Sequence, residues 1–276
     1  MQILVVTCDR DRWQFQMQCW SFCKYLSHTT INIIVNELDA ESWLLWYKAN
    51  CKKYLWRHRV CVYTLNDFPE FFQFAKKTVP TSFSGSGWKT QQALKLLFSV
   101  KTNKKYVVLD SKNWLVQHAR AQDLTAHRRR KSYDPYQEFV QQCYQKFNFQ
   151  QPQFYRPPHT PFWIDPDITK SMFEFFGNEM NACVWLMKTK SPSEFIMYDL
   201  YATSRALDQP DLGTYQDYSK TYWTDAVPPT EQEIQQIVQD KTIMMFSLHL
   251  PVLEQMDRDM IQRAIGFSTK YFYWRF

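Results

Sequence analysis

The feature that most constrains the fold is an apolar strand that ends abruptly at a carboxylate. Residues 106–109 are apolar, and four polar residues follow them directly, namely Asp110, Ser111, Lys112 and Asn113. A buried strand of this kind delivers Asp110 to the carboxyl edge of a sheet, and in open α/β sheets ligands bind at that edge. A simple polar turn is the alternative, because Asp, Ser and Asn favour turns. The pattern around the strand therefore has to decide between the two.

A helical pattern precedes this strand, and its two faces differ in composition. From residue 87 the sequence reads GWKTQQALKLLFS. Its leucines can face a core, whereas Trp88, Gln92 and Lys95 recur at i, i+4 and i+7 on another face. We therefore expect Gln92 and Lys95 to project toward Asp110.

Three more apolar strands alternate with helical patterns before residue 87. The strands are expected at residues 2–6, 31–35 and 60–64, and the helices at 12–26, 41–54 and 69–77. This alternation predicts an α/β fold with a mostly parallel sheet flanked by helices. Because polar residues follow each strand, one edge of the sheet is predicted to gather Thr7, Asp9, Asn36, Asp67 and Asp110. Asp9 has an alternative role as a helix cap.

The alternation stops after residue 114. Helices are expected at residues 134–147, 167–176, 192–207, 231–239 and 254–265, and a late strand at 242–247. Residues 150–166 are rich in Pro and aromatic side chains, which predicts an irregular segment. The second part of the chain is therefore expected to be helical and irregular.

Composition narrows the classes of partner. The net charge of +6 favours an anionic partner such as a phosphorylated ligand. Neither GxGxxG nor GxxxxGK[ST] occurs, which argues against the usual dinucleotide and P-loop sites. The one dense basic run, residues 127–131, is interpreted as a solvated loop. Because no nucleic-acid-binding motif is present, nucleic acid is not expected as a partner.

The cysteines and the apolar runs bear on where in the cell the protein is expected to be. Seven scattered Cys without a CxxC pair predict reduced thiols in a cytoplasmic protein. Met1 leads straight into an apolar strand, so no signal peptide is expected. No apolar run approaches the roughly 20 residues of a membrane span, so any membrane contact is expected to be peripheral.

Six segments in this order resemble a bacterial and phage family of glycosyltransferase-like proteins. They read ILVVTCDRD, GWKTQQALKL, YVVLDSKNWL, TPFWID, SEFIMYDLY and FSLH. The resemblance implies a Rossmann-like GT-A fold in a single domain. It also implies a nucleotide-binding half at residues 1–116 and an acceptor-side half at 117–276.

The resemblance implies a function as well as a fold. The expected activity is that of a hexosyltransferase, which moves a sugar from a nucleotide-sugar donor to a glycan or lipid-linked acceptor. The alternative is a degenerate GT-A domain that binds nucleotide or carbohydrate without turnover. A departure from the family's motif after the fourth strand supports this alternative.

GT-A enzymes usually carry Asp-x-Asp after that strand, where the carboxylates hold a divalent metal that bridges the donor diphosphate. Here Lys112 stands in place of the second Asp. Lys112 can supply the positive charge itself, or Asp110 with Asn113 and His249 can still hold Mn or Mg. We expect weak or absent metal binding, because an ammonium group beside a dication is repulsive.

The remaining candidate residues follow from the same resemblance. On the donor side, Thr7 and Asp9 are expected to contact the base or ribose, and Lys95 to pair with a phosphate or to orient Asp110. On the acceptor side, Glu194 is expected to accept the proton of the acceptor hydroxyl, with Asp199 as second choice. Glu194 is alternatively a carboxylate in the first turn of a helix, where it interacts with the helix dipole.

Overall fold

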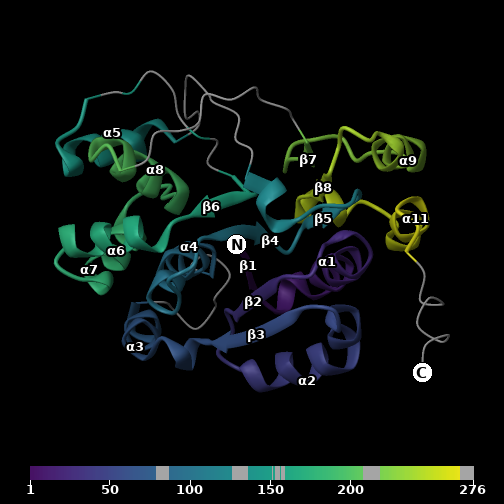
Figure 1. Cartoon of the computed structure of the whole chain (residues 1–276), viewed down its shortest axis with the longest axis horizontal. Coiled ribbons are helices and arrows are strands. Elements are labelled where there is room, and N and C mark those ends of the chain that lie inside the picture. The colour runs from purple at the N-terminus through teal and green to yellow at the C-terminus, as the bar shows by residue number, and fades with distance from the viewer. Residues whose placement is uncertain are drawn as a thin grey trace.

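A computed structural model describes residues 1–78, 87–125, 136–150, 152, 156, 159–207 and 218–267. The basic run at residues 127–131 lies outside this part of the chain. A central sheet lies between two groups of helices (Figure 1). The predicted α/β class, with a mostly parallel sheet flanked by helices, is therefore confirmed.

The central sheet has the strand order β3-β2-β1-β4-β6. Its first four strands are parallel, and they span Gln2–Thr7 (β1), Thr30–Val35 (β2), Arg59–Thr64 (β3) and Tyr106–Asp110 (β4). The edge strand β6, Phe162–Ile164, runs antiparallel to β4. From β1 the chain moves outward to β3 and then returns to β4 on the other side of β1. This reversal makes the carboxyl ends of β1 and β4 the switch point of the sheet, where ligands bind in open α/β folds.

Two hydrophobic cores cover the two faces of this sheet. Alternate residues of β1 point to opposite faces, so that Ile3 and Val5 join one core and Leu4 and Val6 the other. The first core packs α1 (Arg12–Tyr25) and α2 (Ala40–Asn50), and the second packs α4 (Gly87–Leu97). Other helices of the second core are α3 (Pro69–Thr78), α5 (Gln137–Phe147), α6 (Pro166–Phe175), α7 (Glu179–Lys188) and α8 (Glu194–Ser204).

A second, smaller sheet extends from the turn after β4. Its order is β5-β8-β7, with bounds Asn113–Leu115 (β5), Met245–Leu248 (β8) and Ser219–Tyr222 (β7). The helices beside it are α9 (Glu231–Gln239), α10 (Leu250–Leu253) and α11 (Arg258–Ala264). Pairing of β5 with β8 brings residues from the last part of the chain beside the end of β4.

Several elements differ from the sequence prediction. Strands β5 and β6 have three residues each, too short for a periodic signal, and they were expected as a turn and an irregular segment. Strand β7 and helix α7 had no predicted counterpart. The expected helix at 254–265 begins later, as α11, because Asp257 caps its first turn. Within the described part of the chain, no helix has the length and apolar character to cross a membrane.

Candidate functional site

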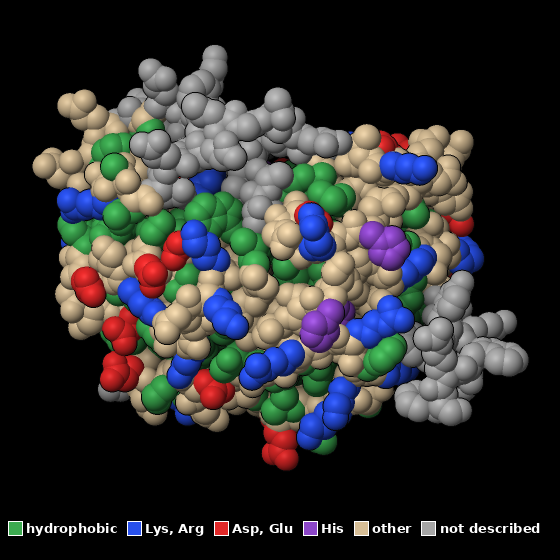
Figure 2. Space-filling view, viewed as in Figure 1, with side chains coloured by type: hydrophobic (Ala, Val, Ile, Leu, Met, Phe, Trp, Pro, Cys, Tyr) green, Lys and Arg blue, Asp and Glu red, His purple; other side chains and the backbone are tan. Residues whose placement is uncertain are grey.

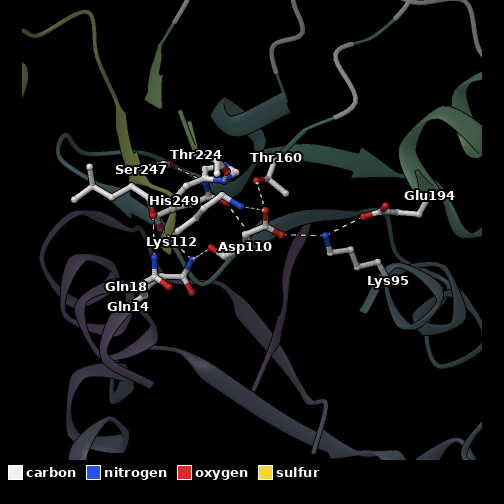
Figure 3. Close-up of polar contacts among 12 residues, drawn as sticks. Gln14, Gln18, Lys95, Asp110, Lys112, Thr160, Glu194, Thr224, Ser247 and His249 are labelled. Carbon is white, nitrogen blue, oxygen red and sulfur yellow. Dashed lines mark hydrogen bonds and ion pairs between the residues drawn. The ribbon is translucent and has the colours of Figure 1, made fainter. Parts of the chain in front are cut away.

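Three hydrogen bonds from the Asn113 and Gln18 side chains hold the turn between β4 and β5. The Asn113 side-chain oxygen accepts a hydrogen bond from the Asp110 amide, 2.6 Å away. From α1, the Gln18 side-chain amide donates to the carbonyl oxygens of Asp110 at 2.7 Å and of Asn113 at 3.0 Å. These bonds satisfy backbone groups where the strand ladder stops. They fix the position from which the Asp110 and Lys112 side chains extend (Figure 3).

Asp110 stands at the centre of a chain of charged contacts. Its Oδ1 lies 3.0 Å from Lys95 Nζ, and its Oδ2 lies 2.5 Å from Lys112 Nζ. The Thr160 hydroxyl donates a third bond, at 3.1 Å. On the far side of Lys95, the Glu194 carboxylate lies 2.8 Å from Nζ. Figure 3 shows this line of contacts running from Lys112 through Asp110 and Lys95 to Glu194.

Burial and charge together set the pKa values in this chain of contacts. Burial raises the pKa of Asp110, but the nearby Lys112 and Lys95 ammonium groups outweigh it and lower the pKa well below its ordinary value. Burial lowers the pKa of Lys95, but Asp110 and Glu194 outweigh it and raise the pKa above its ordinary value. Burial raises the pKa of Glu194, and Lys95 offsets this only in part.

A pocket opens over these residues. It is lined from α4, the β4–β5 turn, α8 and the second sheet, and the lining includes Trp88, Gln92, Lys95, Asp110, Lys112, Asn113, Tyr136, His159, Thr160, Glu194, Thr221, Trp223 and His249. Trp88 and Trp223 are each 46% exposed, so both present ring surface to the pocket and to solvent. The Trp223 ring packs against His249, with centroids 4.6 Å apart, and against His159 at 5.6 Å.

Most of the residues predicted from the sequence meet in this pocket. Gln92 and Lys95 project from α4 toward the end of β4, as the helical spacing predicts. Gln92 accepts a hydrogen bond from the Glu194 amide at 3.1 Å, and Glu194 opens α8 after its cap, Ser193. His249 follows β8 and lies within hydrogen-bonding distance of Thr224. The roles assigned to these residues stay predictions.

Other predicted residues do not line the pocket. Asp199 was the second choice for the base, but it is buried and its carboxylate lies 2.5 Å from Arg156 Nε. It faces inward because it lies five residues after Glu194, on a different side of α8. The Asp9 carboxylate accepts from Arg12, and Asp67 closes a capping box with Thr64.

Thr7 and Asn36 are buried at the carboxyl ends of their strands and are absent from the pocket lining. Of the five residues that were expected along one cleft, only Asp110 lines this pocket.

Sequence reasoning did not find Thr160, Tyr136, His159 or Trp223 as site residues. Thr160 opens the TPFWID segment, which was noted for its resemblance but not for a contact. Its bond to Asp110 joins residues 50 positions apart, and no local pattern encodes such a contact. Trp223 follows β7, a strand that the sequence did not predict.

The donor groups at the end of β4 do not suit a divalent metal. Both oxygens of Asp110 already contact ammonium groups, and the charge of Lys112 also acts on His249. Two positive charges about 4 Å apart repel by roughly 4 kcal/mol at an effective dielectric constant near 20. Among the described residues, no group of three or more His, Cys, Asp and Glu side chains is placed to hold a metal. A resident Mn or Mg therefore does not fit Asp110, Asn113 and His249 as they stand.

The lowered pKa of His249 leads us to expect that the free energy of unfolding falls in mild acid. Burial and the charge of Lys112 lower its pKa to about 4 from the ordinary 6.5, so the unfolded chain binds a proton between these values and the folded chain does not. Stability is therefore full above pH 6.5 and falls as the pH drops toward 4. Urea unfolding at pH 7 and 5 is expected to show about 1–2 kcal/mol more loss for the wild type than for His249→Gln. Equal losses in the two proteins would contradict the lowered pKa.

Three solved structures of glycosyltransferases align with this chain. The galactosyltransferase LgtC, solved with donor and acceptor sugar analogues, aligns over 98% of this chain and 96% of its own, with a TM-score of 0.51 and 11% identity. Mouse xyloside xylosyltransferase 1 aligns over 89% of this chain and 96% of its own, with a TM-score of 0.46 and 8% identity. The bifunctional glycosyltransferase WbbM aligns over 98% of this chain and 50% of its own, with a TM-score of 0.46 and 12% identity.

Comparison of sequences identifies no further relative. No protein-family model and no curated protein matches the chain. At 11% identity, the likeness to LgtC bears on the fold alone. The chain has the GT-A glycosyltransferase fold.

Proposed function

We propose that this chain is a glycosyltransferase that takes a nucleotide-sugar donor in the pocket at the end of β4 and transfers a hexose to a glycan or lipid-linked acceptor. The observation that carries the proposal is Asp110 at the switch point of the sheet, held between Lys95 and Lys112 within that pocket. In the GT-A fold, this edge of the sheet is where a ligand is expected.

Lys112 is the group proposed to hold the donor diphosphate. Its side chain is 20% exposed and lines the pocket, whereas Lys95 is 8% exposed and lies between two carboxylates. An ammonium group has three donors, so Lys112 can keep its contact with Asp110 and still bind a phosphate oxygen. As the bond to the sugar breaks, negative charge grows on the leaving diphosphate, and a fixed cation stabilises it. The base and ribose are proposed to extend beyond the pocket toward Asp9, whose side chain is 51% exposed, whereas the buried Thr7 is out of their reach.

Glu194 is proposed to accept the proton of the acceptor hydroxyl. It lines the pocket, and burial raises its pKa toward the range in which a carboxylate works as a general base. Lys95 stays paired with Glu194 on one side and Asp110 on the other, which keeps the two carboxylates apart in a fixed arrangement.

The exposed rings of Trp88 and Trp223 are proposed to hold sugar. A flat aromatic face packs against the C–H face of a pyranose, while the polar edge of the sugar stays free for hydrogen bonds. Trp223 already rests on His249 and His159, so its ring is ordered before a ligand arrives.

Trp223→Ala is therefore expected to raise the apparent KM about 5- to 10-fold for whichever substrate, donor or acceptor, places its sugar ring on Trp223. Its effect on stability should be small, because the ring is 46% exposed. Phe175→Ala is the control, since this aromatic side chain is 37% exposed and does not line the pocket. Equal KM values for the two variants would remove Trp223 from the site.

A binding domain without turnover is the second candidate function. The contact of both Asp110 oxygens with lysines favours it, because Asp110 then serves to neutralise cations and does not hold a metal. A thermal-shift screen against nucleotide-sugars tests for donor binding, since a specific ligand raises the melting temperature by mass action. Donor hydrolysis in the same samples then separates the two functions. Absence of any stabilising nucleotide-sugar would contradict the transferase and would leave the binding domain only with carbohydrate or free nucleotide as its ligand.

A further inference from the structure

A surface on α2 and the short helix after it has no part in the pocket. The 3-10 helix η2 spans Lys52–Leu55 and continues from α2 after a single residue. Six exposed residues form what we call the basic face, and they are Leu45, Lys48, Lys52, Lys53, Trp56 and Arg57. Leu45 and Lys48 lie three residues apart on α2, Lys52 and Lys53 open η2, and Trp56 and Arg57 follow η2 directly. None of them lines the pocket.

The charge on this face is mostly positive, and the exposed Glu41, one turn before Leu45 on α2, is the acidic residue beside it. From residue 42 to residue 66 the chain contains five Lys and Arg and no Asp or Glu. Within the described part of the chain, the four cations of the basic face form no ion pair with a carboxylate. Figure 2 shows Lys and Arg with hydrophobic side chains over the lower centre of the molecule, where α2 lies in Figure 1, and Asp or Glu at the lower edge of this region. These cations are therefore free for an external anionic partner.

Two large apolar side chains lie among these cations. Trp56 is 62% exposed and Leu45 is 61% exposed, and both are among the most exposed large apolar side chains of the described chain. The Arg57 guanidinium lies over the Trp56 ring, 4.9 Å from its centroid. Trp is enriched at the interface between membrane and water, where one part of the side chain is apolar and another is polar. Cations around exposed apolar side chains are attracted to an anionic bilayer by charge and by burial of the apolar groups together.

We propose that the basic face docks the protein on an anionic membrane surface, with Trp56 and Leu45 entering the headgroup region and the four cations contacting lipid phosphates. Each Lys or Arg close to such a surface contributes about 1 kcal/mol, which is about fivefold in binding. Nucleic acid is the other polyanion that fits four cations. The two exposed apolar residues favour the bilayer, since a duplex backbone gives them no apolar surface to enter. Docking is independent of the transfer reaction, so it stands or falls separately from the proposed function.

Vesicle flotation of the full chain tests this proposal. Vesicles of phosphatidylcholine with phosphatidylglycerol are compared with vesicles of phosphatidylcholine alone, in the absence of any sugar donor. We expect binding to the anionic vesicles only, and we expect high salt to weaken it. Lys52→Glu with Lys53→Glu should reduce the partition coefficient at least about 30-fold, and Trp56→Ala about tenfold.

The matched control is Lys104→Glu with Lys241→Glu. Both lysines are exposed and lie outside the basic face, so the change in net charge is the same. Circular dichroism checks that each variant is folded. Equal loss of binding in the control and in the basic-face variant would overturn the proposal, as would equal binding to neutral vesicles. Binding to random-sequence duplex DNA, without binding to anionic vesicles, would assign the basic face to nucleic acid instead.

Discussion

Lys112→Ala is expected to slow sugar transfer, or donor hydrolysis, by about 10²- to 10³-fold at saturating donor. The reason is that Lys112 is the more exposed of the two described lysines that line the pocket, and its removal leaves the charge on the departing diphosphate without that partner. Folding should be little affected, since Asp110 keeps its contacts with Lys95 and Thr160. Steady-state rates at pH 7, with and without manganese, measure the effect.

The companion variant Lys112→Asp separates charge from position. It places a second carboxylate two residues after Asp110 and removes the repulsion that an ammonium group exerts on a dication. We expect its donor binding to need manganese, whereas that of Lys112→Ala should not be restored by manganese. Lys241→Ala is the control, because this exposed lysine lies outside the pocket. A Lys112→Ala variant with the wild-type rate would show that the lysine has no part in the reaction.

Lys95→Met is expected to lower the free energy of unfolding by about 3–5 kcal/mol. The Lys95 side chain is 8% exposed and lies between Asp110 at 3.0 Å and Glu194 at 2.8 Å. Without it, two carboxylates lie close together. Lys112 still contacts Asp110, and no cation among the described residues contacts Glu194. Urea unfolding at pH 7 measures the loss.

A double variant shows whether this loss comes from the unpaired negative charge of Glu194. Glu194→Gln removes the carboxylate that Lys95→Met leaves unpaired, so the pair of changes should cost less than Lys95→Met alone. Lys105→Met is the control, since its amine pairs with Asp165 but its side chain is 57% exposed. A loss below about 1 kcal/mol for Lys95→Met would mean that the three groups are not a tightly coupled buried set.

The parts of the site that the sequence predicts are those that local patterns encode. Two features can be recognised from a short stretch of sequence. One is an apolar strand that ends at Asp110, and the other is a helix in which Gln92 and Lys95 lie three residues apart on one face. Their meeting follows from the alternation of strands and helices, because consecutive elements pack beside one another. The Lys95–Asp110 contact agrees with that reasoning.

The parts that the sequence does not predict depend on distant segments. Thr160 reaches Asp110 from beside a three-residue strand, and Trp223 reaches the pocket from a strand that forms only by pairing with β8. Asp199 is a residue that the sequence wrongly suggested for the site. Its carboxylate looked available in a helix near Glu194, but the structure pairs it with Arg156, which lies in a segment without periodicity. Which acid of a helix faces a pocket depends on packing, and a single sequence does not contain that information.

The most direct test of the central claim is a calorimetric titration of the wild-type protein with nucleotide-sugars, once in EDTA and once in manganese. The claim is that Asp110, Lys95 and Lys112 form a donor site in which an ammonium group takes the place of a dication. The account predicts that a donor binds in EDTA with the same affinity as in manganese. Binding that disappears in EDTA and returns with manganese would contradict it, because the pocket would then hold a metal that the contacts of Asp110 do not favour.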